Sequence, residues 1–215
     1  MLRHTGGAGI YTERGNSLDV SYSEIHDNGT GVFLNSVLSS SITYTTIYNI
    51  VTCGILHIGN YLADLGIATT SVVDHVTLYK ITGQGTAHWN GYGISFDNAA
   101  DSLCSVTITN SIIANPPFGP VIAGMAAINL GASWPTTYNN NFYGTMANFG
   151  DPGFFVAIDG GLPDSLTDIV GTDAGFTDAE NDDYSLAWGS PCADKASDGT
   201  HIGAWQGTVG INDCR

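Results

Sequence analysis

The stretch LDVSYSEIHDNGTG, Leu18–Gly31, is followed by SSITYTTIYNIVTCG, Ser40–Gly54, and the two segments carry the same pattern. In each, a β-branched residue stands five positions before an isoleucine, and a tyrosine lies between them. Three later segments vary this pattern: SVVDHVTLYKITG (Ser71–Gly83), SVTITNSIIANP (Ser105–Pro116) and TTYNNNFYG (Thr136–Gly144). Self-similarity at a period of about 20 to 50 residues indicates repeat units that stack on one another.

The repeats predict one stacking register. The apolar anchors of successive coils are Ile25, Ile47, Leu78, Ile112 and Phe142, with spacings of 22, 31, 34 and 30 residues. The positions five residues earlier are Val20, Ile42, Val73, Thr107 and Thr137, and those three residues earlier are Tyr22, Tyr44, His75, Thr109 and Asn139. Because Gly and Asn separate short apolar runs and no 3.6-residue stripe persists, these segments are predicted strands. We therefore expect Tyr22 above Tyr44 and Ile25 above Ile47, with the tyrosine stack pointing inward and His75, which belongs to it, a core residue.

The composition of the 215-residue chain excludes several classes of partner. Only 5 Lys and Arg stand against 20 Asp and Glu, so the formal net charge is −15, which disfavours nucleic acid and anionic lipid. Hydrophobic residues make up 43% of the chain, too many for a disordered protein. No run approaches 18 apolar residues, so we expect no membrane span, and the N-terminal stretch lacks an apolar signal core.

Four cysteines, at positions 53, 104, 192 and 214, show no C-x-x-C spacing, which disfavours zinc. Cys192 and Cys214 bracket the C-terminal end, and a disulfide between them is the favoured pairing. Four cysteines allow three connectivities, and the sequence does not choose among them.

The stretch DYSLAWGSPCADKASDGTHIGAWQ, Asp183–Gln206, resembles the closing segment of right-handed parallel β-helix proteins of the pectate-lyase-like superfamily. The matching residues are Asp183, Tyr184, Leu186, Gly189, Ser190, Pro191, Asp194, Ile202, Gly203, Ala204 and Trp205. DPGFF (Asp151–Phe155) and DAGFT (Asp173–Thr177) are similar to strands that precede such segments. His201 departs from the usual Asp of this family pattern, and Gln206 from a frequent Glu.

The resemblance and the repeats together predict an all-β fold, a right-handed single-stranded parallel β-helix of about six to eight coils with loop insertions. Residues 1–150 would form coils, and residues 151–215 the last coils and a C-terminal closing segment of the same domain. An antiparallel sandwich is the alternative fold. The first coil lacks a cap in this sequence, so self-association through open coil ends is expected as an option.

The resemblance implies carbohydrate chemistry, which directs attention to three candidate catalytic residues, Lys80, Asp74 and His88, near the insertion that follows Leu78. A lyase of this superfamily would use Lys or Arg as base, and Lys80 is the best-placed cation. The competing interpretation is that Lys80 is a solvated turn residue. The stacking register places Asp74 as an isolated, outward-pointing carboxylate beside Ser21 and Thr43. It therefore lacks the second carboxylate that glycosidases require.

The lengthened loops supply candidate substrate-binding aromatics: Trp89, Tyr92, Phe118 and Trp134. Exposed rings beside polar groups suit sugars, whose CH faces pack on aromatic rings. The alternative is that these loops fold back and bury the rings as a second small core.

The acidic loop TDAENDDY, Thr177–Tyr184, offers oxygen ligands for Ca²⁺, the one cofactor candidate: Asp178, Glu180, Asp182 and Asp183. Similar turns occur in the superfamily without metal, so an ordinary turn is the alternative.

The leading functional hypothesis is a secreted or cell-surface β-helix module that contacts polysaccharide, without evident catalysis. The first alternative is a polysaccharide lyase or glycoside hydrolase. The second is a structural fibre, filament or adhesion subunit.

Overall fold

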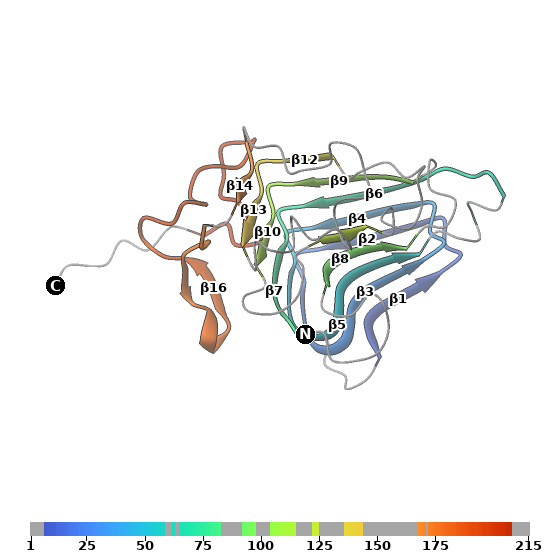
Figure 1. Cartoon of the computed structure of the whole chain (residues 1–215), viewed down its shortest axis with the longest axis horizontal. Coiled ribbons are helices and arrows are strands. Elements are labelled where there is room, and N and C mark those ends of the chain that lie inside the picture. Colours follow the sequence, from blue (N-terminus) through green and yellow to red (C-terminus); the bar gives the residue numbers. More distant parts are fainter. Residues whose placement is uncertain are drawn as a thin grey trace.

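The computed structural model describes residues 7–58, 62, 65–82, 92–97, 104–114, 122–124, 136–143, 167–170 and 172–207. Over these residues the protein is mostly β, and its two main sheets are built from parallel pairs of strands (Figure 1). Strand pairing in this part of the chain is antiparallel only in the short hairpin near the C-terminal end. The architecture is compatible with a β-solenoid, in agreement with the repeat pattern.

The larger sheet has nine strands. Seven follow one another in the order β1 (Ala8–Glu13), β3 (Glu24–Asn35), β5 (Thr46–Ile58), β7 (Thr77–Ile81), β10 (Ile112–Ala114), β13 (Asn141–Tyr143) and β14 (Ile169–Val170). Two more continue the second half of β5: β8 (Tyr92–Asp97) and β11 (Ile122–Gly124). Long strands such as β5 therefore contribute to two regions of this sheet.

The second sheet has five strands, in the order β12 (Thr136–Tyr138), β9 (Cys104–Thr109), β6 (Thr69–Asp74), β4 (Ser39–Thr43) and β2 (Ser17–Ser21). From β1 to β7 the chain alternates strictly between the two sheets, so each strand pairs with the equivalent strand of the next pass. The remaining elements are β15 (Phe176–Asp178), the 3₁₀-helix η3 (Ala179–Asn181) and β16 (Asp183–Leu186).

The predicted register is confirmed over the first three repeats. Val20 pairs with Ile42 and then Val73, and Ile25 pairs with Ile47 and then Leu78. All of these side chains are at most 6% exposed, so they form one continuous apolar interior.

The predicted register of the fourth repeat is wrong by one residue. Leu78 pairs with Ile113, not Ile112, and Val73 pairs with Ile108, not Thr107. Ile112 and Ile113 are equally apolar, so the sequence pattern fits either register. The backbone conformation of the preceding turn determines which of the two faces the interior. Ile112 points instead toward a separate apolar cluster under the C-terminal segment.

The turn between the two sheets has the same backbone conformation in every repeat. One residue per turn is left-handed: Tyr22, Tyr44, His75, Asn110 and Asn139, with φ between 47° and 55°. This conformation costs roughly 1–2 kcal/mol for most residues but less for Asn, whose short side chain bonds locally. Asn110, rather than the predicted Thr109, therefore sets the register of the fourth repeat.

The C-terminal segment, residues 172–207, lies along the flank of the strand stack, as Figure 1 shows for β16 beside β7 and β10. Ile202 is 1% exposed and joins the apolar cluster that also holds Leu186 and Ile112. Gly203 (φ 98°) fits so closely that an added Cβ would lie 2.7 Å from Ile112 Cδ1. The expected packing role of this segment is thus seen, on the side of the stack.

Cys192 is a free, fully buried cysteine, and Cys214, its predicted disulfide partner, lies outside the described residues. The Cys192 side chain packs with Ala174, Leu186 and Ile202, so it serves this cluster as a small apolar group. Burial raises the pKa of the Cys192 thiol to about 12, which keeps it unreactive.

No helix in the part of the chain that the structure describes is long and apolar enough to cross a membrane.

Replacing Ile47 by Ala tests the interior register. Ile47 is fully buried between Ile25 and Leu78, so the loss of its side chain should lower the free energy of unfolding by about 2–5 kcal/mol. The measurement is urea denaturation followed by circular dichroism. Val51→Ala, in the same strand but 39% exposed, is the matched control and should change stability by less than about 0.5 kcal/mol. Equal losses in the two variants would contradict the register.

Candidate functional site

Two pockets open where the C-terminal segment meets the turns of the strand stack. The first, the stack pocket, has a volume of about 390 Å³ and is lined by Tyr22, Tyr44, Asp194, Thr200, His201 and Gln206. The second, the hairpin pocket, has a volume of about 330 Å³ and is lined by Glu24, Tyr44, Thr46, Asp182, Asp183, Tyr184, Ser185, Ala204 and Trp205. Since Tyr44 lines both pockets, they flank one side chain, and together we call them the aromatic groove.

The strand-stack wall of the groove is a pile of aromatic rings, the tyrosine stack of Tyr22, Tyr44 and His75. The rings of Tyr22 and Tyr44 are 4.9 Å apart and nearly parallel, at 2°. Tyr44 and His75 continue the pile at 4.7 Å and 16°. The rings stack because each is the side chain of the left-handed residue at the same turn in successive repeats.

The expectation that this stack points inward is wrong, since Tyr22 is 80% exposed. The left-handed turn residue projects away from the interior. Val20, two positions before Tyr22, and Ile25, three positions after it, point into the interior. His75 is nevertheless only 1% exposed, because the C-terminal segment covers this part of the stack. Sequence reasoning identified the burial of His75 correctly and its cause incorrectly.

His75 ties the stack to both neighbouring parts of the molecule. Its Nδ1 lies 3.0 Å from Asp74 Oδ2, and its Nε2 lies 3.0 Å from Thr200 Oγ1 and 3.6 Å from Asp198 Oδ2. The imidazole thus stands between two carboxylates, one from β6 and one from the C-terminal segment. Burial, followed by these two carboxylates, raises the pKa of the Tyr44 hydroxyl that stacks on the imidazole.

Asp74 accepts hydrogen bonds from Thr109 Oγ1 at 2.6 Å and Asn110 Nδ2 at 2.8 Å, in addition to the contact with His75. Burial opposes ionisation of this carboxyl, but the hydrogen bonds outweigh it and hold the pKa of Asp74 below its usual value. The predicted place of Asp74 beside Ser21 and Thr43 is confirmed by the strand register. Its contacts are those of a group that fastens adjacent repeats together.

The opposite wall of the groove is built on His201 and Trp205, whose rings stack at 5.5 Å and 8°. The backbone N–H of Asp194 donates to His201 Nδ1 at 3.0 Å, and His201 Nε2 donates to the Gly207 carbonyl at 3.0 Å. His201 Nδ1 also lies 3.3 Å from Asp194 Oδ1, so Asp194 contacts the imidazole through both its backbone and its carboxylate. Gln206 fixes the same loop by donating to the carbonyls of His201 and Gly203.

The hairpin pocket places carboxylates on both of its sides. Tyr48 donates to Glu24 Oε1 at 2.6 Å from the strand side, and Tyr184 donates to Asp182 Oδ1 at 3.2 Å from the hairpin side. The two tyrosine rings pack at 5.0 Å beneath the pocket. Burial, followed by the hydrogen bond to Glu24, raises the pKa of Tyr48, and burial with the Asp182 charge raises that of Tyr184.

Lys80 and Asp74 do not share a site. The Lys80 ammonium donates to the Ala179 carbonyl at 3.3 Å and lies 3.6 Å from Glu180, so it anchors η3. Asp74 contacts a different part of the chain, as described above. A lyase base would need a free amine beside the substrate, and in this structure Lys80 lines neither pocket of the groove.

The four acidic residues proposed for Ca²⁺ each have separate partners. Asp178 accepts from Asn181, Glu180 pairs with Lys80, and Asp183 accepts from the Ser185 backbone and hydroxyl. Among the described residues, no group of three or more acidic, His or Cys side chains is arranged to hold a metal ion. Asp182 and Asp183 face the hairpin pocket instead.

The predicted substrate-binding residues Trp89, Phe118 and Trp134 lie outside the described residues, as does the predicted catalytic residue His88. The side chain of Tyr92 lies outside them too, although its backbone in β8 pairs with Cys53. The aromatic groove was not predicted as a site. Its signals were present in the sequence, in the tyrosine shared by the first two repeats and in the two departures from the family pattern, His201 and Gln206.

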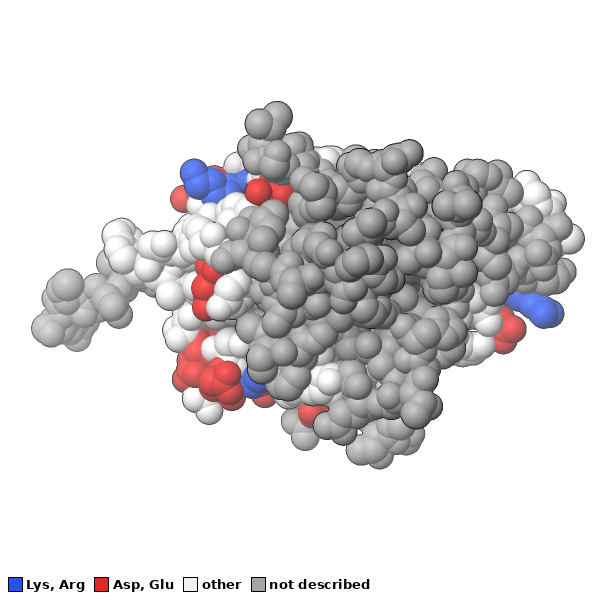
Figure 2. Space-filling model, in the orientation of Figure 1, with Lys and Arg blue, Asp and Glu red and all other residues white. Residues whose placement is uncertain are grey.

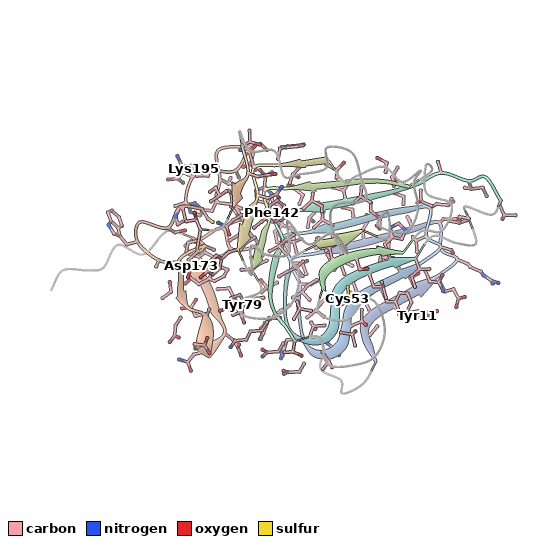
Figure 3. The ribbon with its side chains drawn as sticks, viewed as in Figure 1. Tyr11, Cys53, Tyr79, Phe142, Asp173 and Lys195 are labelled. Carbon is pink, nitrogen blue, oxygen red and sulfur yellow. The ribbon has the colours of Figure 1, made fainter. Side chains whose placement is uncertain are left out.

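Negative charge gathers around this end of the molecule. In the view of Figure 2 the carboxylates that are drawn concentrate over the end that holds the C-terminal segment. Figure 3 places Tyr79 and Asp173 at the same end and Tyr11 at the opposite one. The groove therefore combines aromatic surface with acidic surroundings.

Comparison with protein families, with curated proteins and with solved structures found no match for this chain. The function of the candidate site is therefore inferred from the geometry of its residues.

Replacing Asp74 by Asn tests how this carboxylate joins the repeats. The pKa of Asp74 is lower in the folded state, so its contribution to stability is present above the unfolded-state pKa and is lost as the pH falls through the folded-state pKa. Asp74→Asn should lower the free energy of unfolding by about 1–2 kcal/mol at pH 7. It should also reduce the further loss on acidification.

The measurement for this carboxylate is urea denaturation at pH 7 and at pH 3. Asp19→Asn, at an exposed position of β2 on the same outward face of the second sheet, is the control and should leave both values close to those of the unmodified protein. An Asp74→Asn protein as acid-sensitive as the parent would show that this carboxylate does not stabilise the fold.

Proposed function

We propose that this protein is a right-handed parallel β-helix module that holds a polysaccharide chain in the aromatic groove. The observation that carries the proposal is the end of the tyrosine stack, where Tyr22 is 80% exposed and lines a pocket with hydroxyl, amide and carboxylate groups. The resemblance to pectate-lyase-like proteins and the parallel strand pairing support the β-helix assignment.

Sugar rings suit this combination of side chains. Their CH faces are apolar and pack on aromatic rings, while their hydroxyls lie at the edge and need hydrogen-bond partners. The groove supplies rings from Tyr22, Tyr44 and Trp205, with acceptors such as Asp194 and Asp183 at the rim. Hydrogen bonds from sugar hydroxyls to carboxylates are charge-assisted and therefore stronger than neutral ones.

An isolated exposed tyrosine would carry little information, because single surface apolar groups are normal. Here the rings are held in place before any ligand binds. Each is fixed by its turn and by its ring neighbours, and the opposite wall is fixed by the hydrogen bonds of His201 and Gln206. Pre-organisation of this kind lowers the entropy cost of binding.

A secreted or cell-surface location belongs to the same proposal. The low charged fraction, 12%, and the polar surface of Ser, Thr, Asn and Gly are typical of extracellular β proteins, and polysaccharides are met there.

Glycoside hydrolysis is a second candidate, favoured by the carboxylates of Glu24 and Asp183 that line the hairpin pocket together. Glycosidases use two carboxyl groups on either side of the scissile bond, one as acid and one as base or nucleophile. Release of reducing ends from a polysaccharide panel, abolished in Glu24→Gln and retained in Asp19→Asn, would support this activity. No release from any polymer that binds would leave the protein a binding module.

Replacing Tyr22 by Ala tests the binding proposal. Removal of the most exposed ring should weaken polysaccharide binding at least about tenfold, measured by affinity electrophoresis against a panel of soluble polysaccharides. Tyr11→Ala is the matched control, since Tyr11 is 52% exposed, lies at the other end of the molecule and lines neither pocket (Figure 3). Equal affinity of the two variants would remove the groove from the proposal.

A further inference from the structure

The charges around the aromatic groove determine which polysaccharides it accepts. We propose that the groove binds chains of uncharged sugars and rejects chains that carry carboxylates. This inference rests on the proposed function and adds the substrate class. It runs against the acidic substrates that the name of the resembled superfamily suggests.

Both pockets of the groove are lined in part by carboxylates. Glu24 stands on the strand side of the hairpin pocket, Asp182 and Asp183 on its hairpin side, and Asp194 at the rim of the stack pocket. Behind the tyrosine stack, Asp198 lies within 3.6 Å of His75. Hydrogen bonds from Thr200 hold the pKa of Asp198 below its usual value, so this charge persists at neutral pH.

Within the part of the chain that the structure describes, neither pocket is lined by a Lys or Arg that could balance these charges. The Lys80 ammonium is directed to Glu180 and the Ala179 carbonyl. His201 lines the stack pocket as well, but its Nδ1 lies 3.0 Å from the Asp194 backbone nitrogen and 3.3 Å from Asp194 Oδ1, so this ring is already in contact with a carboxylate of the groove.

An acidic chain would therefore meet repulsion at each sugar. Sites built for carboxylated ligands supply Arg or Lys, whose N–H groups match a carboxylate. Here a sugar carboxylate would be placed within a few ångströms of Asp or Glu. Sugar hydroxyls, in contrast, can donate to these same oxygens, so the lining is an acceptor surface suited to uncharged chains.

The geometry also favours a chain over a single sugar. The stack pocket and the hairpin pocket share Tyr44, which places two sugar-sized spaces on either side of one ring. An oligosaccharide that lies across Tyr44 would fill both pockets, whereas a monosaccharide would fill one. We therefore expect affinity to rise with chain length from one sugar to several.

The test compares matched polymers that differ only in charge. The full chain is measured by affinity electrophoresis against neutral mannan, glucan and galactan, and against the same polymers oxidised at their C6 hydroxyls to carboxylates, all with EDTA present. Whichever neutral polymers bind, their oxidised forms should bind at least about tenfold more weakly at low salt. The difference should shrink as salt is added, because screening acts on charges at the surface.

Variants separate charge from shape. Asp183→Asn combined with Asp194→Asn should at least halve the ratio of neutral to oxidised affinity, whereas Asp19→Asn, outside the groove, should leave it unchanged. Equal or tighter binding of the oxidised polymers by the unmodified protein would overturn the charge inference while leaving the binding proposal intact. Binding of neither form would overturn the proposed function itself, and the inference with it.

Discussion

One backbone constraint underlies this structure, the left-handed residue at the turn between the two sheets. Because this turn recurs with φ near 50° in five repeats, each strand re-enters its sheet in register with the strand before it. A slip of one residue would exchange interior and exterior side chains throughout a repeat. The cost of placing Tyr22, Tyr44 and His75 in a conformation that favours Asn and Gly is offset by the stacking of their rings.

The same constraint determines where aromatic surface can be displayed. A left-handed turn residue projects outward, so a ring at this position is held on the exterior while adjacent apolar residues fill the interior. Where the turn residue is Asn, as at Asn110 and Asn139, the side chain instead bonds to neighbouring segments: Asn110 to Ser197 and Asn139 to Lys195. The same structural position thus either displays an aromatic ring or attaches the C-terminal segment, and at His75 it does both.

Sequence patterns predicted the repeats and most of the interior, because stacking of identical positions leaves a direct trace in the spacing of apolar residues. They failed at the fourth repeat, where Ile112 and Ile113 are equally apolar and the choice depends on the turn at Asn110.

Sequence patterns also failed to predict the candidate site. The groove joins Tyr22 to Trp205, and contacts between residues so distant in sequence have no periodicity to reveal them. Composition likewise does not reveal that the Lys80 ammonium forms an ion pair with Glu180.

The segment that resembles a closing motif has a second consequence for function. Its apolar part, Ile202 and Gly203, packs against Ile112 and Thr77, and this contact fixes the residues on either side of it. His201 and Trp205 flank that anchor on either side, so their rings are carried to the tyrosine stack by the same contact that secures the fold. A change in the anchor would therefore displace one wall of the groove as well as lower stability, whereas a change at Tyr22 would alter the groove alone. The groove is for this reason best understood as a product of docking, with neither the strand stack nor the C-terminal segment able to form it separately.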